Sequence, residues 1–507
     1  MKIFFGLLFT GSVFFCNAQK KPDPVFFGNS IQPENLQKHL YQIAGPDFEG
    51  RETATPGQRK AATYIEDYFK SIGLKPGNKD SFQLAYPVYQ DSLVSTSIRI
   101  NGETFLLNSD FDIRLSNAHT ISFGASEIVF AGYGLSDSLR DDYKGLQVAG
   151  KTVLVLNGYP PGWLQAQINK KNFNSFAKQD AAQQHGATAV LIIQEDFPHI
   201  AVPDVSKMYR NYFLPKIRPN CFYISDRMAR ALMGTDYDLA KTGSMPPKSY
   251  ATNILLSILK QTKMMQSTDV LGYLEGSDLK DQLLVISAHY DHLGKKDSVI
   301  YFGADDDGSG TVSLLELAAA FSKAKAAGRG PRRSILFLAN SGEEKGLWGS
   351  EYYTNHPVYP LDKTTADLNI DMIGRKDPGR KQGDSNNYVY IVGDDKLSSD
   401  LHPISEEMNK KYTGLELDYK FNDPKDPLKI YSRSDHYNFA VKGVPIIFYF
   451  DGINKDYHKP SDTPDKINYD LMAKRAKLVF YTAWEMANRN SMLKRDLPAV
   501  KNERKSD

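Results

Sequence analysis

Alternating apolar and polar segments in the C-terminal half of the chain predict an α/β domain. Short apolar runs typical of buried strands recur between stretches that keep the period of an amphipathic helix. The runs predicted as strands are 283–287, 335–339, 366–370, 389–392 and 446–450, and the predicted helices are 309–327, 349–355 and 468–487. This alternation favours a three-layer α/β/α sandwich, which we expect over residues 251–490.

Residues 120–250 have a different pattern, rich in short strands. The runs predicted as buried strands are 128–130, 153–156, 189–193 and 222–224, and a helix is predicted over 175–185, before Gly186. The segment 243–247 is typical of a linker. We therefore expect a β-rich domain with one or two helices, inserted into the α/β domain after its N-terminal part, residues 19–119.

The pattern predicts two helices before the insertion and a tail at the other end. One helix covers 31–43. The second begins after Thr55, an N-cap residue with Gln58 at the capping-box position, and ends at Gly73. Residues 491–507 form a charged tail, which we expect to be disordered from residue 493 onward.

The first 18 residues have the features of a secretory signal peptide. Lys2 supplies the positive charge, residues 3–15 are apolar, and Cys16-Asn17-Ala18 offers small residues at a cleavage-type spacing. The apolar run is too short to cross a bilayer and no later run is long enough, so we expect no membrane span. Export to the periplasm or the extracellular space follows. Two alternatives stay open, a buried N-terminal strand and a lipid anchor on Cys16.

Composition narrows the classes of function. With 507 residues, the chain is longer than one core usually serves. A formal net charge of +2 without a basic stripe gives no indication of a nucleic-acid partner. Only Cys16 and Cys221 occur, so the processed chain would hold no internal disulfide, and a metal site must use His, Asp and Glu. The oligomeric state stays open.

Five short segments carry side chains that bind metals or move protons. They fall at strand ends or in adjoining loops of the predicted sheet, where ligands of α/β proteins collect. The candidates are His289 with Asp291, the acids Asp305, Asp306 and Asp307, the pair Glu343 and Glu344, Asp371, and His458. Imidazoles and carboxylates in these numbers are what a two-metal hydrolytic site needs, and Asp291 is well placed to accept a hydrogen bond from a ligand histidine.

Each segment alone also has an ordinary structural interpretation. His289 and His458 could be loop or surface histidines, and the three adjacent acids could cap the helix that follows. The two glutamates could lie on a solvated surface, and Asp371 could be a cap. Their joint occurrence at the edge of one sheet favours a metal site, in which one glutamate binds metal and its neighbour faces the attacking water.

With these motifs together, the chain resembles the M28 family of zinc metallopeptidases. The motifs are SAHYDH, GADDDGSG, SGEEKG, NIDMIG and DYHKPSDT. The similarity covers Asn253 to about Asn488, and the segment GREtatPG…AAtYIedyFksiGLkP resembles the family's N-terminal lead-in. Residues 120–250 resemble the protease-associated domain that is often inserted in these enzymes.

The resemblance implies two zinc ions per chain and a role for each residue. His289 and Asp371 would bind the first ion, Glu344 and His458 the second, and Asp306 would bridge both, as the metal set His289, Asp306, Glu344, Asp371 and His458. Glu343 would be the general base. Relatives hold a cis peptide after the bridging aspartate, so one is expected between Asp306 and Asp307.

Two further segments gain a role from the resemblance. Tyr457 matches a position where some relatives place a hydroxyl that polarises the substrate carbonyl, although it could also serve only in packing. The motif Ser434-Asp435-His436 resembles one near the family's active site, so Asp435 and His436 would support the metal ligands.

These implications define an expected function, a secreted dizinc exopeptidase that acts as an aminopeptidase on peptides with a free N-terminus. The surplus of acids, including Asp305 and Asp307, would attract a protonated α-amine. A carboxypeptidase or a glutaminyl cyclase on the same fold stays open as an alternative, as does a non-catalytic binding protein.

Overall fold

The computed structural model describes residues 23–138, 140–162, 174–197, 201–211 and 217–501. The predicted leader, with Cys16, lies outside these residues. The chain divides into two compact units: unit 1 comprises the residues up to Tyr86 together with those from Ser267 onward, and unit 2 comprises Pro87–Gln266. Within the described residues, no helix combines the length and the apolar character needed to cross a membrane.

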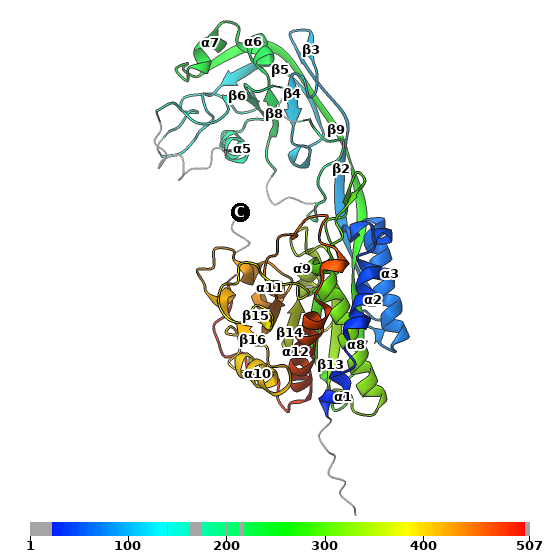
Figure 1. The fold of residues 1–507 in the computed structure, drawn as a ribbon. Coiled ribbons are helices and arrows are strands. Elements are labelled where there is room, and N and C mark those ends of the chain that lie inside the picture. The colour runs from blue at the N-terminus through cyan, green and yellow to red at the C-terminus, as the bar shows by residue number, and fades with distance from the viewer. Residues whose placement is uncertain (1–22, 139, 163–173, 198–200, 212–216, 502–507) are drawn as a thin grey trace, which may run out of the picture. The chain divides into compact units, whose positions relative to one another are not determined.

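Unit 1 is built around a largely parallel sheet (Figure 1), with strands in the order β16-β15-β17-β14-β10-β13-β9. Their bounds are β10 Leu279–His289, β13 Arg333–Asn340, β14 Thr364–Ile370, β15 Tyr388–Val392, β16 Glu416–Asp418 and β17 Ile446–Phe450, with β9 described below. The four strands β13, β10, β14 and β17 pair in parallel, whereas β9 and β15 flank them in antiparallel pairing. Every residue of β13, β14 and β17 is buried, as expected for central strands covered on both faces.

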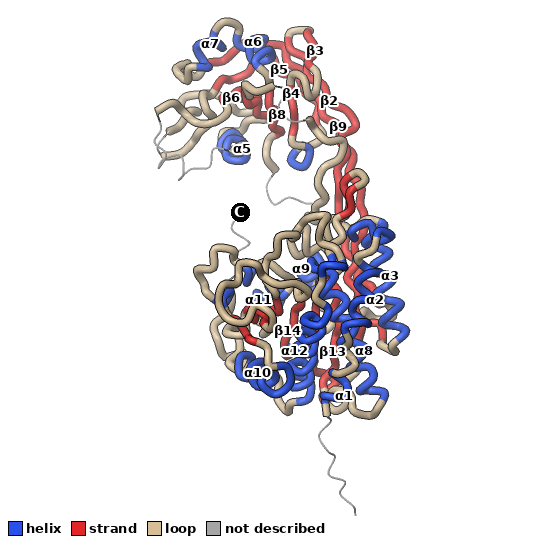
Figure 2. The backbone as a smooth tube through the Cα atoms, viewed as in Figure 1, coloured by secondary structure: helices blue, strands red, loops and turns tan. Residues whose placement is uncertain are grey.

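Helices cover both faces of this sheet (Figure 2). They are α1 Pro24–Gly28, α2 Pro33–Ile43, α3 Pro56–Ser71, α8 Gly310–Ala326, α9 Trp348–Asn355, α10 Leu401–Met408, α11 His436–Val441 and α12 Tyr469–Asn488. Successive strand residues point to opposite faces. Ile286 of β10 therefore joins a core with α8 and α12, while Val285 packs on the other side with Tyr353 of α9 and Phe439 of α11. The predicted three-layer sandwich is confirmed.

In unit 2 the strand order is β9-β5-β6-β7-β8-β4, which continues the hydrogen-bonded path of the same sheet through the shared strand β9. Its elements are β3 Glu103–Phe105, β4 Phe111–Ile113, β5 Ile121–Phe130, β6 Thr152–Leu156, β7 Ala189–Ile193, β8 Asn220–Ile224, α5 Ser175–Gln184, α6 Asp226–Met233 and α7 Asp236–Lys241. The four strands from β5 to β8 pair in parallel. The described part of unit 2 thus contains α5, α6 and α7, more helix than the one or two that we expected.

The bounds of unit 2 also differ from those expected for the insertion. The block 120–250 falls inside the unit, which in addition includes 87–119 and 251–266. The reason is visible in the core: Phe105 of β3 and Phe111 of β4 pack with the strands of unit 2 and belong to its hydrophobic cluster. Sequence pattern had assigned this stretch to the α/β domain.

Two long strands cross the boundary between the units. They are β2, Gln83–Ile100, and β9, Lys248–Leu274. β9 pairs with β5 through its N-terminal part and with β13 and the short β1, Lys75–Pro76, through its C-terminal part. Sequence pattern missed this continuity because residues 259–266 include no buried position, so the alternation of a half-buried strand is absent there.

The C-terminal segment differs from the prediction as well. We expected disorder from residue 493, yet the side chain of Leu493 is buried and its N–H donates to Thr365 Oγ1 at 3.0 Å. The carboxylate of Asp496 accepts hydrogen bonds from the N–H and the hydroxyl of Ser399. Residues 493–501 are therefore attached to unit 1 through one buried apolar anchor and several polar contacts.

Candidate metal centre

The candidate residues converge at the carboxyl ends of the parallel strands of unit 1. His289 is the last residue of β10, and Asp371 directly follows β14. Glu343 and Glu344 lie in the loop after β13, and His458 in the loop after β17. Because parallel strands place their carboxyl ends at one edge, four loops that are distant in sequence meet there.

The first group of side chains surrounds His289, which is buried. Its Nε2 lies 3.3 Å from Asp306 Oδ1 and 3.6 Å from Asp371 Oδ1. Ligand atoms held tetrahedrally at zinc distances of about 2.0–2.2 Å lie roughly 3.3–3.6 Å from one another. The two distances from His289 Nε2 therefore have the length that a shared tetrahedral metal ion requires.

The second group surrounds His458. Its Nε2 lies 3.0 Å from Asp306 Oδ2 and 3.2 Å from Glu344 Oε2. Asp306 thus turns one carboxylate oxygen to each histidine, the arrangement of a bridging ligand. The resemblance assigned Glu344, His458 and Asp306 to one ion, and this assignment stays a prediction.

Two further residues approach these groups. Asp307 lies with His289 and Asp371 in a set whose potential ligand atoms are all within 4.8 Å of one another, and His292 lies in a similar set with Asp306 and Glu344. Sequence pattern missed His292, which is buried and places Nδ1 2.7 Å from Glu344 Oε1. The second histidine of the HYDH motif was the available signal.

The electrostatics of the centre favour bound positive charge. Burial opposes a charge on His458, yet the neighbouring carboxylates of Asp306 and Glu344 raise the pKa of this histidine to about 10. In the described part of the chain, the buried atoms His289 Nε2 and Asp306 Oδ2 make no well-oriented hydrogen bond, although each lies close to the ligand atoms given above. Buried polar atoms without partners are uncommon, so this donor set fits a cation.

The three adjacent acids have three different roles. Asp307 Oδ1 accepts the N–H groups of Gly310, at the start of α8, and of Met372, so the capping interpretation holds for this residue. Asp305 accepts from the N–H of Gly374 and from the Asn454 side chain. Asp306 alone faces the two histidines, and the peptide bond between Asp306 and Asp307 is cis, as expected.

The loops that carry these ligands are bound to one another. Asp462, four residues beyond His458, accepts the N–H groups of Asp305 and Asp306 through Oδ2. Arg51 is fully buried and donates to the carbonyl oxygens of Tyr290 and Gly303, which flank the two ligand loops. The predicted N-terminal lead-in therefore supports the centre directly.

Asp291 lies beside His289, although its contacts differ in detail from the expected ones. The hydrogen-bond partner of His289 Nδ1 is the main-chain oxygen of Asp291 at 3.1 Å, and the Asp291 carboxylate is 3.7 Å from the same nitrogen. That carboxylate accepts from the hydroxyl of Thr53 and from the N–H of Glu343. Asp291 thus connects the histidine with the glutamate loop.

Glu343 faces the centre without taking part in either histidine group. Its Oε2 lies 3.9 Å from His289 Nε2, and 13% of its side chain is exposed. Burial raises the pKa of this carboxyl well above its ordinary value. A carboxylate beside the centre with a raised pKa has the properties of a general base.

The predicted supporting residues Asp435 and His436 lie farther away. Asp435 Oδ1 accepts from the hydroxyl of Ser350, and burial raises the pKa of Asp435 to about 7. His436 bonds through Nε2 to the carbonyl oxygen of Tyr431 and stacks on Phe448. Among the described residues, no hydrogen bond or ion pair joins Asp435 to a candidate ligand, although the nearby charges of His289 and Asp371 act on its pKa.

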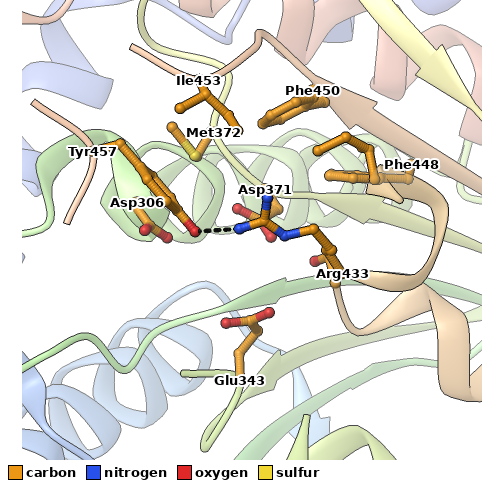
Figure 3. Close-up of a pocket in the computed structure, with 11 residues that line it drawn as sticks. Asp306, Glu343, Asp371, Met372, Arg433, Phe448, Phe450, Ile453 and Tyr457 are labelled. Carbon is orange, nitrogen blue, oxygen red and sulfur yellow. Dashed lines mark hydrogen bonds between the residues drawn. The ribbon is translucent and has the colours of Figure 1, made fainter. Parts of the chain in front are cut away.

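A pocket opens beside the two groups (Figure 3). Its polar side includes Asp306, Glu343 and Asp371, and its other side is formed by apolar side chains. The apolar lining residues are Met372, Ile430, Phe448, Phe450 and Ile453. Tyr457, Arg433 and Ser434 complete the lining, and an Arg433 guanidinium nitrogen donates to Tyr457 Oη at 3.0 Å. Sequence pattern missed Arg433, which precedes the Ser434-Asp435-His436 motif.

Comparison with known proteins agrees with this geometry. Residues 269–483 match the model of the family described as Peptidase family M28. A probable leucine aminopeptidase of Arthroderma otae is 32% identical over 216 residues, which cover 41% of this chain and 56% of that protein. Leupeptin-inactivating enzyme 1 of Streptomyces exfoliatus is 29% identical over 205 residues, covering 36% of this chain and 42% of that protein. The chain therefore spans about half the length of the curated relatives that it matches.

A solved structure is similar over nearly the full length. The aminopeptidase from Aneurinibacillus sp. strain AM-1 superposes with a TM-score of 0.53 at 19% identity, covering 94% of this chain and 99% of that one. At this identity the similarity concerns the fold, and it extends over both units.

Proposed function

We propose, from the membership of residues 269–483 in peptidase family M28, that the chain is a dizinc aminopeptidase. The observation that carries this proposal is the placement of Asp306, whose two carboxylate oxygens each face a different histidine. A shared carboxylate between two ligand groups is what a pair of closely spaced metal ions needs. The names of the relatives, an aminopeptidase among them, support the same activity.

Five residues would hold the two zinc ions. His289 and Asp371 would bind one ion, Glu344 and His458 the other, and Asp306 both. Bound zinc supplies Lewis acidity and lowers the pKa of a water molecule towards neutrality. Asp307 and His292, the additional members of the two sets, have other contacts: Asp307 caps α8, and His292 approaches Glu344.

The chain's own groups then carry the proton transfers. Glu343 takes the proton of the attacking water and delivers it to the leaving amine, for which its place beside both ligand groups is suitable. The hydroxyl of Tyr457 donates to the carbonyl oxygen of the substrate as negative charge develops there. The pocket beside them holds the side chain of the residue that is removed.

The pocket lining indicates the class of substrate. Its apolar side, with Met372, Phe448 and Phe450, suits a large apolar side chain, which gains about 25 cal/mol per Å² of buried surface. The carboxylates on its polar side would attract a protonated α-amine. This attraction is smaller than the sequence suggested, because Asp305 and Asp307 accept main-chain N–H groups instead. We propose peptides with a free, apolar N-terminal residue as substrates.

One observation favours a second candidate, a carboxypeptidase. That activity needs a cation for the terminal carboxylate of the substrate, and the pocket lining contains Arg433. The two candidates share the metal chemistry and differ only in the end of the peptide that they recognise. Peptides with blocked termini therefore separate them.

The deciding experiment uses one tripeptide, Leu-Gly-Gly, in three forms with zinc-loaded protein: unmodified, N-acetylated and C-amidated. The Glu343→Gln variant serves as the inactive control. We expect acetylation of the N-terminus to abolish cleavage. Amidation of the C-terminus should change the rate by less than about threefold, because contacts that bind the substrate and the transition state equally contribute little to turnover. Loss of cleavage on amidation alone would assign the carboxypeptidase activity. Absence of any cleavage would contradict the peptidase function.

Three further points belong to the same proposal. Export to the periplasm or the extracellular space rests on the signal-like pattern of residues 1–18. Unit 2 would be a protease-associated domain, an assignment supported by its position between the two parts of unit 1. A glutaminyl cyclase is the remaining enzymatic alternative, and a zinc content of one ion per chain would favour it over the aminopeptidase.

A further inference from the structure

Arg433 and Tyr457 both line the pocket, and Figure 3 shows their hydrogen bond near Asp306 and Asp371. The guanidinium donates to Tyr457 Oη at 3.0 Å, and Arg433 is exposed to solvent. Among the described residues, no carboxylate forms an ion pair with Arg433. The hydrogen bond to the Tyr457 hydroxyl is therefore the polar contact that we consider for the Arg433 side chain.

The direction of this hydrogen bond follows from chemistry. A guanidinium has only donors, and a phenol has one proton to donate and lone pairs that accept. Tyr457 must accept from Arg433, so its own proton is left to point elsewhere. A partner with an acceptor atom, such as an amide or a carboxylate, could capture that proton instead.

The phenol ring is held in place on its other sides. It stacks on the ring of His458 with centroids 3.9 Å apart, and it packs against the apolar cluster that includes Phe448 and Phe450. A phenol has an ordinary pKa of about 10, so its hydroxyl is protonated at neutral pH. A fixed ring with a protonated hydroxyl leaves the direction of the O–H bond as the remaining freedom.

We propose that Arg433 is a positioning residue, which occupies an acceptor site of Tyr457 Oη and thereby leaves the phenolic proton free for the substrate oxyanion. The inference rests on the proposed aminopeptidase function and adds a residue to it. This role differs from a purely structural one, in which Arg433 would have no effect on the oxyanion. It also differs from the alternative in which Arg433 binds a substrate carboxylate.

The test compares three substitutions that differ in hydrogen-bonding chemistry. Arg433→Lys keeps a donor-only cation, Arg433→Met removes every polar atom, and Arg433→Gln introduces an acceptor for the phenolic proton. Leucine p-nitroanilide serves as the substrate, because it has neither a charged side chain nor a carboxylate. Zinc content, measured by mass spectrometry, verifies that each variant is loaded equally.

The expected order of kcat is distinctive. Removal of one oxyanion donor by Tyr457→Phe lowers kcat roughly 10²-fold, the usual scale for such a group. Arg433→Met lowers kcat by about tenfold, which is less than the loss in Tyr457→Phe because the phenol is still present. The KM of this variant changes by less than about twofold. Arg433→Lys stays within about threefold of the wild type, and Arg433→Gln is at least as slow as Arg433→Met.

A double variant isolates the coupling between the two residues. In the Tyr457→Phe background no phenolic proton exists, so adding Arg433→Met should change kcat by less than about twofold. An equal effect of Arg433→Met in both backgrounds would overturn the proposal, as would an effect on KM alone or a Gln variant as fast as the Lys variant. A wild-type protein without hydrolysis would contradict the proposed function itself, and the role of Arg433 with it.

A binding measurement gives a readout independent of turnover. The boronic acid analogue of leucine forms a tetrahedral oxyanion, whereas free leucine does not. By calorimetry on zinc-loaded protein, Arg433→Met should weaken boronate binding by about tenfold and leucine binding by less than about twofold, because only the oxyanion accepts the phenolic proton. Equal weakening of both ligands would assign Arg433 to general binding and overturn the proposal.

Discussion

At the scale of single residues, the three adjacent acids show how neighbours of identical chemistry acquire different roles. The carboxylate oxygens of Asp305 and Asp307 accept hydrogen bonds from main-chain and side-chain amide N–H groups. Through Asp307, these hydrogen bonds connect the loop after β14 with the start of α8. Asp306 is left to face His289 and His458. The hydrogen bonds of its two neighbours therefore help to hold Asp306 facing the histidines.

The adjacent glutamates give the first prediction. Glu343→Gln should retain both zinc ions while lowering kcat by roughly 10²–10⁴-fold, the range for loss of a general base. Glu344→Gln should lower zinc affinity instead, since Glu344 lies 3.2 Å from His458 Nε2. Metal analysis after dialysis, together with turnover, measures both. Loss of zinc from the Glu343 variant would reassign that residue as a ligand.

A buried lysine in unit 2 gives a prediction on pH. Lys178 donates to the carbonyl oxygens of Tyr133 and Gly158, and burial lowers the pKa of its ammonium group from 10.5 to about 8. Between these two values the unfolded chain binds more protons than the folded one, so this residue makes the free energy of unfolding increase as the pH rises from 8 to 10.5. The full change is about 3 kcal/mol, from 1.36 kcal/mol per pKa unit.

Urea unfolding at pH 7.5, 8.5 and 9.5 tests this prediction. The slope of the free energy of unfolding against pH should be smaller in Lys178→Met, which has no titrating group at this position. The exposed Lys207, in the same unit, provides a matched control, and Lys207→Met should keep the wild-type slope. Identical slopes in the wild type and in Lys178→Met would show that the folded protein does not depress this pKa.

At the scale of elements, the carboxyl ends of β10, β13, β14 and β17 explain why the site lies where it does. The strands β13, β14 and β17 are buried throughout and β10 is buried from Leu283 to His289, and each is followed by a loop that carries a candidate ligand or base. Side chains on such supports need little ordering when a ligand binds, which favours precise geometry.

The C-terminal segment gives a prediction at this scale. Leu493 is 4% exposed and belongs to the main core of unit 1. Leu493→Ala should lower the free energy of unfolding by roughly 2–5 kcal/mol, as is usual for a buried leucine. Lys494→Ala, at the neighbouring exposed position, should change it by less than about 0.5 kcal/mol. Chemical denaturation measures both, and equal effects would contradict the anchoring role of Leu493.

At the scale of the whole molecule, all candidate ligands belong to unit 1, which suggests that the metal stabilises the two units unequally. A ligand that binds only the folded state stabilises it by about 4 kcal/mol at 1,000 times its Kd. Calorimetry with zinc and with a chelator should therefore show one transition that shifts and one that does not. Equal shifts of both transitions would contradict a centre confined to unit 1.

The period of the hydrophobic pattern was sufficient to predict the three-layer fold, because central parallel strands and amphipathic helices differ clearly in spacing. It also placed His289, Asp371 and the glutamates at strand ends, since those positions follow directly from the strand limits. The N-cap at Thr55 was predicted for the same local reason, and the structure confirms it. Local signals of this kind act over a few residues and are written in the sequence itself.

Only the tertiary structure decided which residues that are far apart in the sequence contact one another. Arg433 and Tyr457 meet because the segment before α11 and the loop after β17 line one pocket. His292 reaches Glu344 because two loops from different strands are adjacent. The strand β9 crosses from one unit to the other through residues 259–266, none of which is buried, so no apolar pattern marks it. The sequence by itself determined the elements and the residue types at their ends, whereas packing between distant loops decided which of those residues act together.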